Sequence, residues 1–150
     1  MTALQSSVAA GDVRAGREDG TELPELRVDA PPTFVVATAI ATRDFYPVHH
    51  DRDAAVAGGS KDIFVNILTT TGLVQRYVTD WAGPEALVRG IALRLGAPWY
   101  AYDTVTFTGR VVDTVEEDGE SRFLVDVVGR NSLGDHVTAT VRIVLPEGGA

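Results

Sequence analysis

Residues 63–82 constrain the fold more than any other part of this chain. Their twenty positions carry only two charges, Arg76 and Asp80, and apolar side chains occur on every face of a helix built from them. A helix that is apolar on all sides has to be buried on all sides. Because Ser60 or Asp62 can cap the first turn, the sequence predicts one long, buried, central helix.

The second half of the chain is strand-like. Gly83-Pro84 ends the helix, and apolar and polar residues then alternate, as they do from Val137 to Ile143. Gly119 and Gly134 mark turns. The expected strands are residues 87–95, 104–115, 122–131 and 136–145. One buried helix followed by such a meander predicts an α+β chain with a single hot-dog fold, in which an antiparallel sheet wraps around the long central helix.

The first third of the chain contains shorter elements. Residues 1–22 are small and polar without periodicity, which predicts a disordered tail, and residues 23–150 form the folded domain. We expect a short strand at 23–28, a short helix at 33–42, a loop at 45–48 and a helical turn from 51 to about 59. A single sheet layer leaves one edge uncovered, so we expect the domain to pair with a copy or a homologue.

The charge balance excludes several classes of function. A formal net charge of −8 argues against binding to nucleic acids or to anionic membranes, whose phosphates the chain would repel. The absence of cysteine removes disulfides, thiolate zinc sites and thiol nucleophiles. The three histidines show no metal-ligand spacing, so no metal is expected. With neither a signal peptide nor a membrane-spanning run, the cytoplasm is the expected location.

An acid and a histidine lie five residues apart in the loop after the first helix. Pro47 bridges Asp44 and His49, and both side chains could face one crevice and reach one water. Hydration of an enoyl thioester needs such a pair for proton transfer, and it needs donors for the oxygen that becomes negative. The backbone N–H groups of Val65 and Asn66, near the start of the central helix, could supply these donors. The spacing alone also fits a surface loop with a capping aspartate.

The same loop resembles a known motif. Residues 41–49 (ATRDFYPVH) resemble the hydratase motif of MaoC-like proteins, Gly-Asp-x-Asn-Pro-aliphatic-His, which Asp44, Pro47, Val48 and His49 match. Residues 96–105 and 131–137 resemble the family's later strand entry and final hairpin. The resemblance covers about residues 30–145 and implies that Asp44 and His49 are the catalytic pair, without deciding which of them takes the proton.

Three departures from the family pattern concern this site. Tyr46 stands where the family has the motif asparagine, and Arg43 stands where it has glycine. Val65-Asn66 replaces the usual His-Gly at the start of the central helix. A backbone N–H donates whatever its side chain is, so the change to Asn66 alters the shape of the pocket and not the donor.

Three further stretches resemble one group within the family. Residues 41–53, 59–68 and 75–83 are similar to the small subunits of actinobacterial steroid side-chain enoyl-CoA hydratases. This likeness implies a steroid (cholesterol) side-chain enoyl-CoA as substrate, a heteromer with a second MaoC-like subunit, and a downstream aldolase that cleaves the product. It implies no cofactor, because coenzyme A is part of the substrate. The candidate contacts for its phosphates are Arg76, Arg89, Arg94 and Arg130.

Other readings stay open at this point. The chain could be a homodimeric straight-chain (R)-specific enoyl-CoA hydratase. It could be a thioesterase, although the central helix offers only Asp80 as a carboxylate. It could also be a non-catalytic scaffold that binds acyl-CoA. His136, which follows a turn, is expected to be exposed.

Overall fold

The computed structural model describes residues 18–145. Residues 1–17 of the expected tail and residues 146–150 of the expected domain lie outside this part of the chain. The first strand begins at Glu22, and the Gly20 N–H just before it already donates to the Val111 carbonyl at 2.8 Å.

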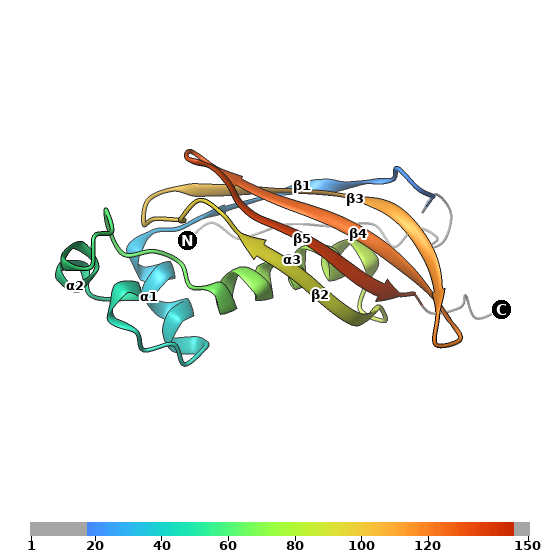
Figure 1. The fold of residues 1–150 in the computed structure, drawn as a ribbon, viewed down its shortest axis with the longest axis horizontal. Helices are drawn as coiled ribbons and strands as arrows, with labels where there is room; N and C mark the ends of the chain where they lie inside the picture. Colours follow the sequence, from blue (N-terminus) through green and yellow to red (C-terminus); the bar gives the residue numbers. More distant parts are fainter. Residues whose placement is uncertain (1–17, 146–150) are drawn as a thin grey trace.

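The chain forms one five-stranded antiparallel sheet with a long helix against one face (Figure 1). The strand order is β1-β3-β4-β5-β2, which confirms the predicted α+β hot-dog arrangement. The elements in chain order are β1 (Glu22–Asp29), α1 (Pro32–Ala41), the 3-10 turn η1 (Pro47–His49), α2 (Arg52–Ala57), α3 (Ile67–Ala82), β2 (Leu87–Leu95), β3 (Thr104–Glu117), β4 (Glu120–Asn131) and β5 (Gly134–Val144).

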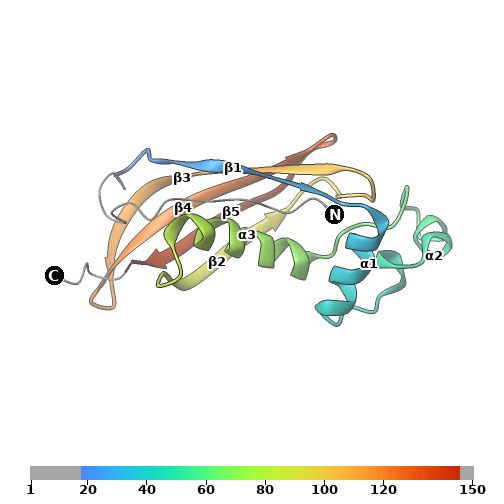
Figure 2. The ribbon, with the colours of Figure 1, turned by 180° about the vertical axis from the view of Figure 1, so that it is seen from behind.

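The core lies between the sheet and α3. Strand alternation turns a row of small and branched side chains toward the helix, and in one such row Val111, Val125 and Val141 stand opposite one another on neighbouring strands. All three are fully buried. Seen from behind, α3 lies along this inner face, with α1 and α2 beyond its amino-terminal end (Figure 2). That end therefore meets the loop that carries Asp44 and His49.

The central helix starts later than the sequence predicted. Asn66 caps it, because its side-chain oxygen accepts the Thr69 N–H at 3.1 Å, and neither Ser60 nor Asp62 serves as the cap. Residues 63–65 are held outside the helix by the segment before β3: Val65 N–H donates to the Trp99 carbonyl, and Ala101 N–H to the Ile63 carbonyl. This pairing joins segments that are far apart in the sequence, so local helix signals cannot predict it.

The expectation that α3 is buried on every side was wrong for the single chain. Ile67 and Leu68 are about half exposed, and Gln75 also faces solvent. The reason is geometric, because one layer of sheet covers only one side of a helix. An apolar side therefore remains open.

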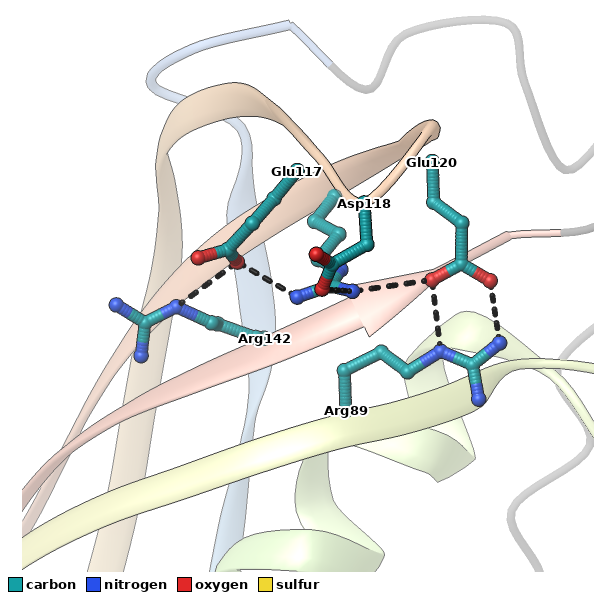
Figure 3. Close-up of polar contacts among 6 residues, drawn as sticks. Arg89, Glu117, Asp118, Glu120 and Arg142 are labelled. Carbon is teal, nitrogen blue, oxygen red and sulfur yellow. Dashed lines mark hydrogen bonds and ion pairs between the residues drawn. The ribbon is translucent and has the colours of Figure 1, made fainter.

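The hairpin between β3 and β4 carries an ion-pair cluster that joins four strands (Figure 3). Arg122 of β4 contacts Glu117, Asp118 and Glu120, and Arg89 of β2 forms a two-bonded pair with Glu120. Arg142 of β5 lies 3.9 Å from Glu117. The cluster ties the beginning of β2 to the sheet, far from the amino terminus of α3.

No helix among residues 18–145 is long and apolar enough to cross a membrane.

Candidate active site

The end of α1 fixes Asp44. The Arg43 N–H donates to the Ile40 carbonyl, and the Asp44 N–H donates to the Ala39 carbonyl at 2.9 Å. This is the Schellman pattern that ends many helices, and it needs one residue in the left-handed region, usually glycine. Here that residue is Arg43, with φ of 59°. The helix end therefore sets where the Asp44 carboxylate points.

Pro47 starts the single 3-10 turn that carries His49. The ring of His49 is buried, and its Nδ1 lies 2.8 Å from the Phe64 carbonyl oxygen. A carbonyl oxygen can only accept, so Nδ1 carries the proton and donates. The Phe64 ring also packs edge-on against the imidazole, with centroids 4.9 Å apart. These contacts fix the ring and leave Nε2 facing the site, where an unprotonated Nε2 presents its lone pair.

The two side chains meet, as the loop spacing suggested. Nε2 of His49 lies 3.4 Å from Oδ2 of Asp44, and the two side chains are 9% and 23% exposed. A hydrogen bond from the Asn66 amide holds the pKa of Asp44 below its usual value against the opposing effect of burial. The Tyr46 N–H lowers that pKa further, as does the positive charge of His49 when its imidazole is protonated. An ionised carboxylate and an imidazole lone pair are both acceptors, so a water beside the pair can donate to both.

The amino terminus of α3 lies beside this pair. The Val65 N–H is bonded to the Trp99 carbonyl at 2.9 Å, so this donor is not free to hold a substrate oxygen. The Asn66 N–H has no acceptor among the residues that the structure describes. The side chain of Asn66 donates to Asp44 Oδ2 at 3.0 Å, a contact that sequence reasoning missed. Its one signal was an asparagine where the family has glycine.

The four candidate arginines are not brought together. Arg76 pairs with Asp80 on the surface of α3, Arg89 pairs with Glu120, and Arg130 pairs with Asp135. Only Arg94, of these four, has no carboxylate partner within the described chain. It lies near the end of β2, and its side chain lines a depression on the outer face of the sheet, away from α3.

Neither His136 nor a metal cluster of the described residues adds to this site. His136 is buried and not exposed as expected: its Nδ1 donates to the Ala97 carbonyl at 2.7 Å, and its Nε2 pairs with the Thr70 hydroxyl at 2.9 Å. It serves packing. Among residues 18–145, no three acidic or histidine side chains gather closely enough to hold a metal.

Some hollows in the described surface lie away from this pair. Three shallow depressions line the outer face of the sheet, away from α3, on side chains such as Thr106, Thr108 and Val128. None of these three depressions includes Asp44 or His49.

The fold and the acid–histidine pair together define a hot-dog protein of the hydratase type. No protein-family model matches the chain. The R-hydratase PhaJ1 of Pseudomonas aeruginosa shares the fold, with a TM-score of 0.77 at 20% identity over 87% of this chain and 83% of that one.

Two matches from Mycobacterium tuberculosis, one protein sequence and one solved structure, are much more similar. The 3-oxo-4,17-pregnadiene-20-carboxyl-CoA hydratase beta subunit is 70% identical over 124 residues, which are 83% of this chain and 93% of that protein. A chain in the crystal structure of the ChsH1–ChsH2 complex is 66% identical, with a TM-score of 0.81 over 86% of this chain and 98% of that one. The chain belongs to the MaoC-like hydratase family that includes this beta subunit.

Proposed function

We propose that this chain is the catalytic subunit of an enoyl-CoA hydratase, a hydro-lyase that adds water to a steroid side-chain enoyl-CoA. The observation that carries the proposal is the facing pair, Asp44 Oδ2 and His49 Nε2, 3.4 Å apart. Two acceptors at this separation can each take one hydrogen of the same water and leave its oxygen lone pairs free to attack. No cofactor takes part, because coenzyme A is carried by the substrate.

The pair handles one proton in each direction. The water oxygen bonds to the β-carbon and loses a proton to the pair, while the electrons of the double bond move toward the thioester carbonyl. The pair then returns a proton to the α-carbon, so the sum is one water added and nothing else consumed. Asp44 enters ionised because Asn66 and the Tyr46 N–H lower its pKa. The mechanism needs one proton on the pair after attack, whichever group bears it.

The thioester oxygen becomes negative during attack and needs a donor. The Asn66 N–H supports this role because it is free, lies at the positive end of α3, and is nearly excluded from solvent. A backbone donor of this kind typically contributes a rate factor of about 10² to 10³.

The steroid substrate is proposed from the relative and from the open apolar surface. The beta subunit that is 70% identical is named for a pregnadiene carboxyl-CoA. Phe45 and Tyr46 are exposed beside Asp44, and Ile67 and Leu68 are exposed beside Asn66. A rigid, apolar ring system would cover such side chains, whereas a short straight chain would leave most of them in water.

A second MaoC-like subunit is the proposed partner, and the edge strand β2 supports it. In the inward-facing row that crosses the sheet, Val137 of β5 is 1% exposed, whereas Leu95, opposite it on β2, is 38% exposed. The core layer therefore thins toward β2. The other edge, β1, is interrupted by Pro24 and a register shift, which disfavours further pairing there.

The test is loss of the enoyl-thioester ultraviolet absorbance. We expect the chain co-expressed with a second MaoC-like subunit to hydrate a steroid side-chain enoyl-CoA. We expect Asp44→Asn or His49→Gln in this assembly to lower kcat by about 10² or more. Full activity of the assembly carrying both changes would reduce this chain to a scaffold. Turnover of crotonyl-CoA by the chain alone would favour the homodimeric straight-chain hydratase.

The thioesterase reading has little support. Asp80 is the one carboxylate on α3, and it lies exposed at the far end of the helix in a surface pair with Arg76. A carboxylate in that position has no protected water to activate. Release of free coenzyme A, followed with a thiol reagent, should stay at background in the assay above.

A further inference from the structure

The side chain of Asn66 makes three hydrogen bonds in a nearly closed environment. Its Oδ1 accepts the Thr69 N–H at 3.1 Å, and its Nδ2 donates to Thr42 Oγ1 at 2.8 Å and to Asp44 Oδ2 at 3.0 Å. The residue is 1% exposed. The Thr69 N–H requires an acceptor and the Asp44 carboxylate requires a donor, so the amide can be oriented in only one way.

Thr42 fixes the direction of the second bond. Its hydroxyl donates to the Thr38 carbonyl at 2.8 Å, which leaves the oxygen lone pairs to accept from Asn66. Both amide hydrogens are therefore used, one on the end of α1 and one on the carboxylate. Asn66 thus joins two elements that the sequence separates by more than twenty residues.

We propose that Asn66 is a positioning residue that locks the Asp44 carboxylate to the amino terminus of α3. One residue then carries both the backbone N–H that faces the thioester oxygen and the amide that holds the acid. The distance between the donor for the carbonyl and the group that handles the proton is set by a single side chain. This inference rests on the proposed hydratase function and names a role within it.

The Asn66 side chain is long enough to reach the Asp44 carboxylate from the end of a helix, and this placement favours the reaction. Small misplacements of a reacting group cost large rate factors, so a carboxylate held from a helix end is more productive than one held by a flexible loop. The loop of this chain offers only the Tyr46 N–H, at 3.3 Å. The hydrogen bond from Asn66 is also the largest cause of the lowered pKa of Asp44, in agreement with a strong contact.

Asn66→Ser separates the two roles of the side chain. Serine caps helices about as well as asparagine, but it is too short to hold both Thr69 and Asp44. In the assembled enzyme we expect the melting temperature to stay near that of wild type and kcat to fall about ten-fold or more, with KM changed little. Asn66→Ala loses the cap as well and is the matched control for stability.

The Asp44 carboxyl gives a readout that capping alone would not move. We expect its titration, followed by carbon NMR and assigned with Asp44→Asn, to shift to higher pH in Asn66→Ser. His49 is the titratable group that faces it and is present in both proteins. Thr42→Val, which removes only the hydroxyl, should shift the titration in the same direction by less.

Wild-type kcat together with an unchanged Asp44 titration in Asn66→Ser would overturn the proposal. Equal losses of kcat and stability in the serine and alanine variants, without a shift in the titration, would reduce Asn66 to a helix cap and also overturn it. If wild type hydrated no enoyl-CoA, the proposed function would fail, and the NMR titration would still decide the contact.

Discussion

At the scale of the residue, Arg43 occupies the position before Asp44, the proposed catalytic acid, in a conformation that glycine adopts most easily. Its φ of 59° is required by the helix end that places Asp44. An L-residue costs about 1–2 kcal/mol in this conformation relative to glycine. Replacing Arg43 by glycine would remove this cost, but it would also make the unfolded chain more flexible, which lowers stability by about 0.4–1 kcal/mol.

We therefore expect Arg43→Gly to raise the free energy of unfolding by up to about 1 kcal/mol, measured by urea unfolding. Arg43→Val, which adds a β-branch in the same conformation, should lower it and also reduce hydration activity by moving Asp44. A marked loss of stability in the glycine variant would mean that the arginine side chain, not its backbone, matters here.

His136 is a second residue whose role depends on burial. Desolvation lowers its pKa, opposed by the hydrogen bond to Ala97. An unfolded histidine titrates near pH 6.5, so between that value and the lower folded pKa the unfolded chain binds more protons. The contribution of His136 to stability is complete above about pH 6.5 and is lost as the pH falls below it.

Unfolding by urea at pH 7.5 and 5.5 should therefore show lower stability at the acidic pH. His136→Gln, which has no titrating group, should be less stable at pH 7.5 but lose less on acidification. The same acid sensitivity in both proteins would assign the effect to other groups.

At the scale of the element, α3 packs tightly against the sheet at Gly109 of β3. A Cβ built there would lie 2.9 Å from the Tyr77 ring of α3 and 3.0 Å from the Asp126 carbonyl oxygen. By contrast, Gly72 of α3 is exposed and has open space around it. Close packing between helix and sheet therefore requires a glycine at position 109, but it does not require one at position 72.

We expect Gly109→Ala to lower the free energy of unfolding by about 1–3 kcal/mol through overpacking. Gly72→Ala should raise it by up to about 1 kcal/mol through helix propensity. Thermal and urea unfolding of the two variants measure both effects. Equal and small changes would show that the helix–sheet spacing is adjustable.

Strand β2 carries two candidate arginines with different surroundings. Arg89 is held by Glu120 in the hairpin cluster, whereas Arg94 has no carboxylate partner among the described residues and lies on the outer face of the sheet. Only a cation that is not already paired adds much to phosphate binding. We expect Arg94→Gln to raise KM for acyl-CoA several-fold with kcat kept.

Arg89→Gln is the matched change at the other end of the strand. It should lower the melting temperature, because Glu120 loses its partner, and leave KM as in wild type. An unchanged KM in both variants would place the coenzyme A phosphates on the partner subunit.

At the scale of the whole molecule, the described chain resembles one half of a larger assembly. The apolar layer is closed over β3, β4 and β5 and open at β2 and along one side of α3. We expect Leu95→Glu to weaken association with the second subunit, because a charged side chain would replace an apolar one in the uncovered layer.

Ala92→Glu, on the outward face of the same strand, is the control and should associate normally. Size-exclusion chromatography of the co-expressed pairs distinguishes them, and equal behaviour of the two variants would move the interface away from β2.

Much of this architecture follows from local sequence patterns. The strand at residues 87–95 has the bounds that its alternation predicts, and Gly119 lies at the predicted hairpin. The two-residue period is a property of neighbouring side chains, so the sequence alone specifies it. The Asp44–His49 pairing was likewise readable, because the two residues belong to one loop with a rigid proline between them.

The rest was decided by tertiary structure. The late start of α3, the Phe64 carbonyl on His49 and the Asn66 amide on Asp44 all join groups that are fifteen or more residues apart. A backbone carbonyl has no sequence signature, and an asparagine at a helix start reads the same whether or not its amide meets a carboxylate. The sequence by itself therefore determined the strands, the central helix and the pair that is proposed to react. Only the packing of α3 against the loop and the segment before β3 decided how that pair is held, because hydrogen bonds between distant segments depend on where the completed fold brings them.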